Sequence, residues 1–187
     1  MNPLVPTVGK LLSLLTILGQ VMVLIILISF FIYKKNKNKF YLLDILDKHA
    51  LVFSFIIALV ATLGSLFYSE IAGYEPCKLC WFQRIFMYPL VLLLGMAVWK
   101  NDNGISNYVI AMSTVGAFVA GYHYLLQIGA APALVPCSTV GYSVSCVEKF
   151  VMNFGYITIP LMSLTAFLLI FLFLRPDRVS ADTSKEE

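Results

Sequence analysis

The chain has 187 residues, of which 60% are hydrophobic and 12% are charged, and its mean hydropathy is +0.87. A soluble globular domain carries about twice that share of charged residues, so the composition excludes this class. The formal net charge is only +3. The sequence contains no glycine-rich nucleotide loop, and nothing in it supports a nucleic-acid partner.

Long uncharged runs predict five transmembrane helices. A spanning helix needs about 20 largely apolar residues, and the runs place these helices at 10–33, 49–71, 79–99, 106–129 and 154–174. The third reaches this length because it begins near Leu79 and includes Arg84. The fourth ends at the sequence Gly-Ala-Ala-Pro, residues 129–132. The predicted fold class is therefore an all-α, multi-pass membrane protein.

The basic residues predict how these helices are oriented. One side of the membrane receives nine of the 13 Lys and Arg residues: Lys34, Lys35, Lys37, Lys39, Lys48, Lys100, Arg175, Arg178 and Lys185. The other side has Lys10, Lys78, Arg84 and Lys149. Because basic loops stay in the cytoplasm, the loops 72–78 and 130–153 are expected on the extracytoplasmic side of the cell membrane. All four cysteines fall on that side, where disulfides persist.

The octapeptide CKLCWFQR, residues 77–84, opens the third predicted helix. A CxxC pair is either a two-electron redox device or half of a metal site. The positive end of the helix dipole lowers the pKa of a nearby thiol, and Arg84 lies four residues after Cys80, on the same helix face. These two effects predict a reactive thiolate at Cys80 more than at Cys77.

Arg84 and His123 predict a pocket within the membrane. An arginine one turn below the surface is costly unless it snorkels or finds a partner, and an interfacial anchor is its ordinary explanation. Its planar donors also suit a carbonyl oxygen that becomes anionic on reduction, which a lipid-soluble quinone provides. His123 lies at a similar depth, with Gln127 one turn later. A lone histidine can simply bond a neighbouring helix, but the shared depth favours a quinone site.

Cys137 and Cys146 form a second candidate pair, separated by eight residues with a turn at Gly141. A bridge across this short loop is either a structural staple or a partner for thiol–disulfide exchange with the first pair. A tetrahedral zinc site made from all four cysteines is a further alternative. The oxidising compartment argues against metal binding, so exchange is favoured and no metal is expected.

Three segments together resemble the disulfide bond formation protein B family, the quinone-reducing membrane oxidases, and in particular its short-loop Gram-positive form. They are PCKLCWFQRIFMYP at 76–89, YHYLLQ at 122–127, with the cysteine loop that follows it, and GYITIP at 155–160. The resemblance covers about 45–175. It implies a four-helix oxidase bundle at 46–175, preceded by an extra transmembrane helix and basic linker at 1–45 and followed by a polar cytoplasmic tail at 176–187.

The resemblance also implies a role for each cysteine. A thioredoxin-like extracytoplasmic protein would attack the Cys137–Cys146 disulfide at Cys137, and Cys146 would then attack Cys77. Cys80, freed as a thiolate, would pass electrons to menaquinone or ubiquinone, with Arg84 and His123 lining that site. The other partner is membrane lipid. A vitamin K epoxide reductase-like quinone reductase, and a non-enzymatic protein with passive bridges or zinc, remain as alternatives.

Overall fold

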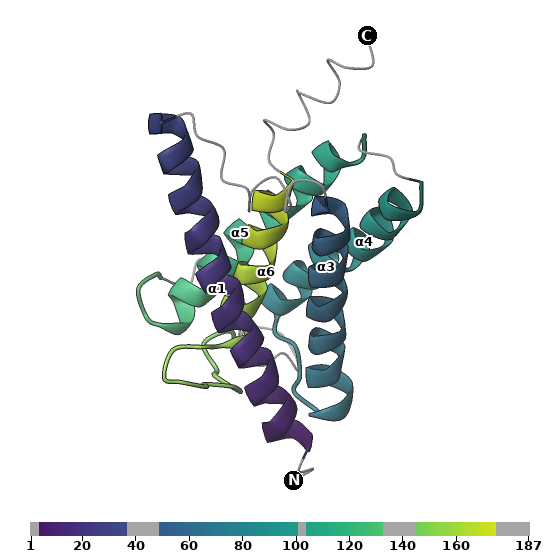
Figure 1. Cartoon of the computed structure of the whole chain (residues 1–187). Helices are drawn as coiled ribbons and strands as arrows, with labels where there is room; N and C mark the ends of the chain where they lie inside the picture. Colours follow the sequence, from purple (N-terminus) through teal and green to yellow (C-terminus); the bar gives the residue numbers. More distant parts are fainter. Residues whose placement is uncertain (1–3, 37–48, 101–103, 133–144, 175–187) are drawn as a thin grey trace.

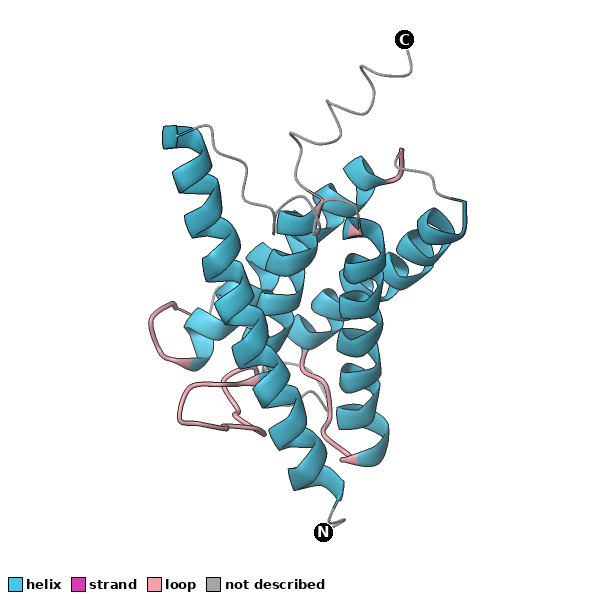
Figure 2. Cartoon of the chain, in the orientation of Figure 1, coloured by secondary structure: helices cyan, strands magenta, loops and turns pink. Residues whose placement is uncertain are grey.

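The computed structural model describes residues 4–36, 49–100, 104–132 and 145–174 (Figure 1). Their regular structure is helical (Figure 2), with α1 at Leu4–Asn36, α3 at Ala50–Leu66, α4 at Lys78–Lys100, α5 at Ser106–Gln127 and α6 at Ile159–Phe173. A π-helical turn, η1 at Phe67–Ile71, extends α3. The expected all-α fold class is confirmed. The predicted linker from residue 37, the tail at 176–187 and Cys137 lie outside the described residues.

Four helical segments are long and apolar enough to cross a membrane: Leu4–Ser29, Ala50–Ile71, Lys78–Lys100 and Ser106–Gln127. The fifth, α6, is apolar but shorter than predicted, because it begins at Ile159 rather than near residue 154. Pro160 occupies its first turn, where a proline is tolerated. Phe154 and Gly155 have φ angles of 54° and 79°, which are incompatible with a right-handed helix.

The helices α3, α4, α5 and α6 form a bundle in which each packs against the next and α6 packs back against α3. The bundle centre is apolar, with Leu90, Leu94, Phe167 and Ile170 fully buried. Large apolar side chains also cover the outside, including Leu92 at 70% and Phe118 at 75% exposure. Lipid chains accommodate such a surface, as expected for a multi-pass membrane protein.

At Gly116, α5 packs tightly against α6. A Cβ at this position would overlap the ring of Phe167, which is fully buried. We expect Gly116→Ala to lower the free energy of unfolding by about 1–3 kcal/mol, as overpacking does in other cores. Thermal unfolding in detergent measures this change. Gly121→Ala is the matched control, since its Cβ would meet only Leu164, at 4.0 Å. Equal losses of stability in the two variants would contradict the packing argument.

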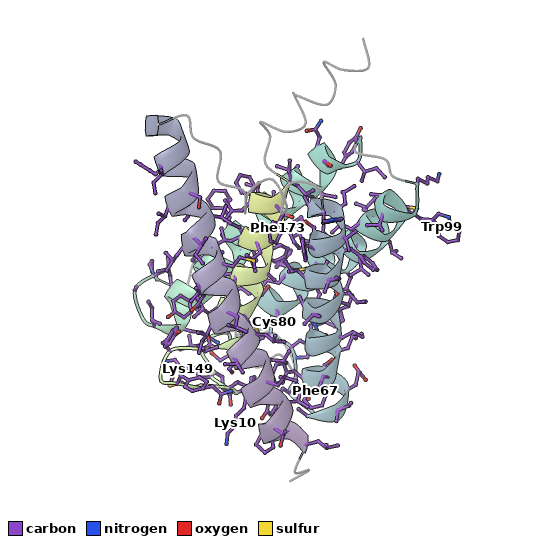
Figure 3. All side chains as sticks on the ribbon, viewed as in Figure 1. Lys10, Phe67, Cys80, Trp99, Lys149 and Phe173 are labelled. Carbon is purple, nitrogen blue, oxygen red and sulfur yellow. The ribbon has the colours of Figure 1, made fainter. Side chains whose placement is uncertain are left out.

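Helix α1 packs outside this bundle, against α6, and its carboxyl end projects away from the other helices (Figure 1). Its amino end lies at the same end of the molecule as the loops that precede α4 and α6. Figure 3 shows Lys10 and Lys149 toward this end and Cys80 farther along the bundle, while Trp99 and Phe173 lie toward the opposite end. The segments that carry the described cysteines therefore meet at one end of the bundle.

Candidate active site

The first cysteine pair spans the start of α4. Cys77 precedes the helix, and its carbonyl oxygen accepts a hydrogen bond from the Trp81 N–H at 3.1 Å. Its sulfur accepts the backbone N–H of Cys80 at 3.4 Å. The two sulfurs lie 3.2 Å apart as free thiols. The geometry of a helix amino terminus thus holds the pair together, with Cys77 at the capping position.

The thiolate at this site is stabilised on Cys77, whereas the sequence predicted Cys80. The hydrogen bond with the Cys80 thiol, and then the one with His123, lower the pKa of Cys77. The backbone N–H at the helix start also points to Cys77. The difference arises because the helix begins one residue after Cys77, so in the reduced pair Cys77 itself receives the amino-terminal donors.

His123 connects the two cysteine segments. Its Nδ1 accepts a hydrogen bond from Gln83 Nε2 at 2.9 Å, and its Nε2 lies 3.1 Å from the carbonyl oxygen of Cys146. Because a carbonyl oxygen only accepts, the Nε2 atom carries the hydrogen. The same atom is 3.7 Å from the Cys77 sulfur. The imidazole is 1% exposed. It extends from α5 into the interior, where it contacts α4 and the segment before α6.

Cys146 lies beside Cys77 in a small buried cluster that includes Leu79 and Leu126. Cys146 is disulfide-bonded and 1% exposed. Its predicted partner, Cys137, lies outside the described residues. Gln127 ties this segment to α5, because its Nε2 donates to the Glu148 carbonyl at 3.1 Å. The structure therefore places Cys77, Cys80, His123 and Gln127 around one pocket, with Cys146 in the buried cluster beside it and Arg84 elsewhere.

Cys80 also lines a second and much larger space. An apolar cavity of about 400 Å³ lies between α1, α3, α4 and α6, and its walls include Cys80 and Arg84 but not Cys77. The Arg84 guanidinium is held at the wall by α3, with Nε 3.0 Å from Ser65 Oγ and an NH2 group 3.2 Å from the Ser65 carbonyl oxygen. It also lies 5.4 Å from the Trp81 ring centroid. One sulfur and one cation thus share an apolar cavity.

Arg84 and His123 were predicted to line the same pocket, and the structure places them beside two different pockets that share Cys80. His123 and Gln127 lie in the pocket beside Cys77, whereas Arg84 faces the large cavity. Consecutive residues of a helix point about 100° apart. Gln83 therefore meets His123 on α5, while Arg84 meets Ser65 on α3. The sequence argument used depth in the membrane alone and left out this rotation. It also gave no role to Gln83 or Ser65.

The side chains that could bind a metal ion bear on the alternative of a zinc site. Within the described residues, one group of three could hold a metal ion: Cys77, Cys80 and His123, whose donor atoms lie within 4.8 Å of one another. A site made from four cysteines would need Cys146 as a thiolate. Cys146 is engaged in a disulfide instead. The arrangement of two thiols beside a buried disulfide suits thiol–disulfide exchange better than a four-cysteine metal site.

Comparisons with known proteins agree with this chemistry. The model of the family described as Disulfide bond formation protein DsbB matches residues 47–175. Disulfide bond formation protein C of Bacillus subtilis (strain 168) is 44% identical over 131 residues, which is 68% of this chain and 93% of that protein. Probable disulfide formation protein C 2 of Bacillus anthracis is 34% identical over 143 residues, which is 76% of this chain and 100% of that protein. No solved structure matches the chain significantly.

Proposed function

The chain belongs to the Disulfide bond formation protein DsbB family, a membrane thiol–disulfide oxidase family, and from this premise we propose that its electron acceptor is a membrane quinone. Its electron donor is a thioredoxin-like protein on the extracytoplasmic side. Four apolar spans support a multi-pass membrane protein. The excess of basic residues on the opposite side supports an extracytoplasmic location for the cysteine end.

The observation that carries the proposal is the division of labour between the two sulfurs of one CxxC pair. Cys77 packs beside the disulfide-bonded Cys146. Cys80 lies 3.2 Å from Cys77 and also reaches the apolar cavity that contains Arg84. A path for two electrons therefore enters at Cys77, which faces the second cysteine pair. It leaves at Cys80, which faces the apolar cavity.

The proposed sequence of exchanges conserves electrons at each step. A thiolate of the partner attacks the Cys137–Cys146 disulfide and forms a mixed disulfide at Cys137, which releases the Cys146 thiolate. The second thiol of the partner then resolves this bridge, so the partner leaves oxidised. Cys146 attacks the Cys77–Cys80 disulfide at Cys77 and releases Cys80 as a thiolate. Cys137 then attacks Cys146 of this bridge, which closes the Cys137–Cys146 disulfide again and releases Cys77 as a thiolate. The Cys77–Cys80 dithiol would give two electrons and two protons to a quinone in the cavity and so close to a disulfide, with Cys80 as the sulfur that faces the acceptor.

The cavity suits a quinone. Its walls are mostly apolar, as a lipid-soluble ring and chain require. A quinone supplies a two-electron sink whose carbonyl oxygens become anionic on reduction. The Arg84 guanidinium is fixed by Ser65 and faces the same cavity, so its donors stabilise that charge where it develops. Menaquinone and ubiquinone both satisfy these requirements.

The decisive experiment mixes the purified protein, without oxygen, with a reduced thioredoxin-like protein and either menaquinone or ubiquinone. We expect quinone absorbance to fall, with one quinone reduced for each partner dithiol oxidised. Counting thiols in the same samples follows the two bridges. Bridges that stay oxidised while the quinone absorbance stays constant would instead identify a protein with passive disulfides.

His123 is assigned to the exchange side of this path. We expect His123→Phe to slow the Cys146–Cys77 exchange about tenfold, the equivalent of one good hydrogen bond, and to leave the quinone dissociation constant within about twofold, because the imidazole does not line the cavity. Rapid acid quenching with thiol counting measures the exchange. His49→Phe, at the start of α3, is the matched control. Weakened quinone binding with normal exchange would return His123 to the acceptor site.

A further inference from the structure

Helix α1 lies outside the family match but lies against the acceptor cavity. The family model begins at residue 47, and a Bacillus anthracis relative aligned along 100% of its own length covers 76% of this chain. The oxidase core is therefore matched without α1. Six α1 residues nevertheless line the same cavity as Cys80 and Arg84: Leu12, Leu15, Thr16, Leu18, Gly19 and Met22.

Specific contacts fix the position of α1 over this cavity. Asn153 Nδ2 donates to the Gly9 carbonyl oxygen at 3.2 Å and to Ser13 Oγ at 2.8 Å. Two close approaches reinforce this anchor, since Gly19 lies against Thr165 of α6 and Gly64 of α3 lies against Leu12. Lipid offers no hydrophobic drive between helices, so close packing and polar bonds set their register. The helix is docked in one register across the groove between α3 and α6.

The part of the cavity wall covered by α1 contains an unusual polar group. Tyr68 is 4% exposed and lines the cavity, and its buried hydroxyl has no hydrogen-bond partner among the described residues. A Cβ on Gly9 would lie 3.6 Å from that hydroxyl, so the first turns of α1 cover it. A buried hydroxyl without a partner is costly. Tyr68 belongs to the π-helical turn η1, a type of irregularity that is frequent at functional sites.

We infer that α1 completes the acceptor site: it forms the lipid-side wall of the cavity, and the Tyr68 hydroxyl beneath it donates a hydrogen bond to a carbonyl oxygen of the bound quinone. This inference rests on the proposed function. It assigns the added helix to acceptor binding rather than to anchoring alone. A quinone in this site contacts α1 with its ring or chain. Its polar contacts are the Tyr68 hydroxyl of η1 and Arg84 of α4.

Two neighbouring leucines of α1 test the wall. Leu15 lines the cavity and Leu14 does not, although they are similarly exposed, at 44% and 52%. We expect Leu15→Trp to raise the dissociation constant of menaquinone at least about fivefold, and Leu14→Trp to change it less than twofold. The rise of the thermal unfolding midpoint with quinone concentration measures binding on the full chain. Equal dissociation constants in the two variants would overturn the wall assignment.

Tyr68→Phe tests the polar contact. We expect the menaquinone dissociation constant to rise about fivefold, while the unfolding midpoint without quinone does not fall, because the lost hydroxyl has no protein partner. Tyr108→Phe, at an exposed position of α5, is the control. An unchanged dissociation constant in Tyr68→Phe would remove Tyr68 from the site. A lowered midpoint without quinone would show that the hydroxyl serves folding instead.

The failure of this inference is distinct from the failure of the proposed function. If the wild-type protein reduces quinone and Leu15→Trp behaves like Leu14→Trp, α1 is not part of the site. If the wild-type protein neither binds nor reduces quinone, the proposed function itself fails. Should Leu15→Trp not fold, Leu15→Ala replaces it. That variant opens the wall and is expected to raise the dissociation constant about threefold, and an unchanged value would equally overturn the inference.

Discussion

Replacement of Cys80 by serine is expected to abolish quinone reduction, with a loss of at least about 10³-fold, as for other variants that lack the reacting nucleophile. Cys80 is the sulfur of the first pair that lines the apolar cavity, so no other thiol of that pair replaces it. Anaerobic stopped-flow measurement of quinone absorbance gives the rate.

The same variant should accumulate a bridge between Cys77 and Cys146: without Cys80, the Cys77 thiolate attacks Cys146 of the Cys137–Cys146 disulfide and releases Cys137 as a thiol, and no Cys80 thiol is present to break the new bridge. Mass spectrometry of the alkylated protein identifies this bridge. Cys77→Ser is the matched control: it is also expected to stop electron flow from the partner, but without any bridge to Cys146. Full turnover by Cys80→Ser would refute the relay. Bridge formation through Cys80 in Cys77→Ser, at a similar yield, would exchange the roles of the two sulfurs.

The helices and the end at which the cysteines meet were predictable from the sequence, because the membrane imposes strong constraints on both. Runs of about 20 apolar residues must be helical in lipid, and three of the five predicted segments match spans within two residues, while the first span begins at Leu4 rather than at residue 10. The start of α6 was less predictable. It depends on the local backbone of Phe154 and Gly155 and on Pro160, whose effects are smaller than that of the apolar run.

The arrangement of the site was only partly predictable, because helix rotation decides which residues share a pocket. The spacing of Cys80 and Arg84, four residues apart, placed them on one face, and both line one cavity. His123 belongs to another helix, and depth alone gave no direction for its side chain. Its neighbour Gln83 belongs to the octapeptide, but a glutamine at that position does not by itself predict a contact with His123. Its contact with His123 emerges only from the packing of α4 against α5.

The cavity walls were the least predictable feature. Nothing in the α1 sequence distinguishes Leu15, which lines the cavity, from Leu14, which does not. The distinction arises because Asn153, far along the chain, fixes the rotation of α1 through Gly9 and Ser13. Such long-range polar contacts have no periodic signature. Pattern arguments therefore proposed the reactive residues but missed much of the surface that surrounds them.

Replacement of Arg84 by lysine is expected to lower kcat/KM for quinone about 10–100-fold, while exchange with the partner protein stays within about twofold. Hydrogen bonds to a charged group contribute about 1.5–3 kcal/mol, and lysine cannot reproduce the planar fork that meets Ser65 through Nε and NH2. Steady-state quinone reduction and single-turnover partner oxidation, measured on the same samples, separate the two effects.

Ser65→Ala is the graded control for this prediction. It removes the Oγ that fixes the guanidinium but keeps the cation and the Ser65 carbonyl oxygen, so the loss in kcat/KM should lie between those of the wild type and Arg84→Lys. If Arg84 acts only as an interfacial anchor, lysine replaces it, because both side chains snorkel and carry one positive charge. Wild-type quinone kinetics in Arg84→Lys would therefore favour the anchor. A selective loss, intermediate in Ser65→Ala, requires a guanidinium held in place at the acceptor.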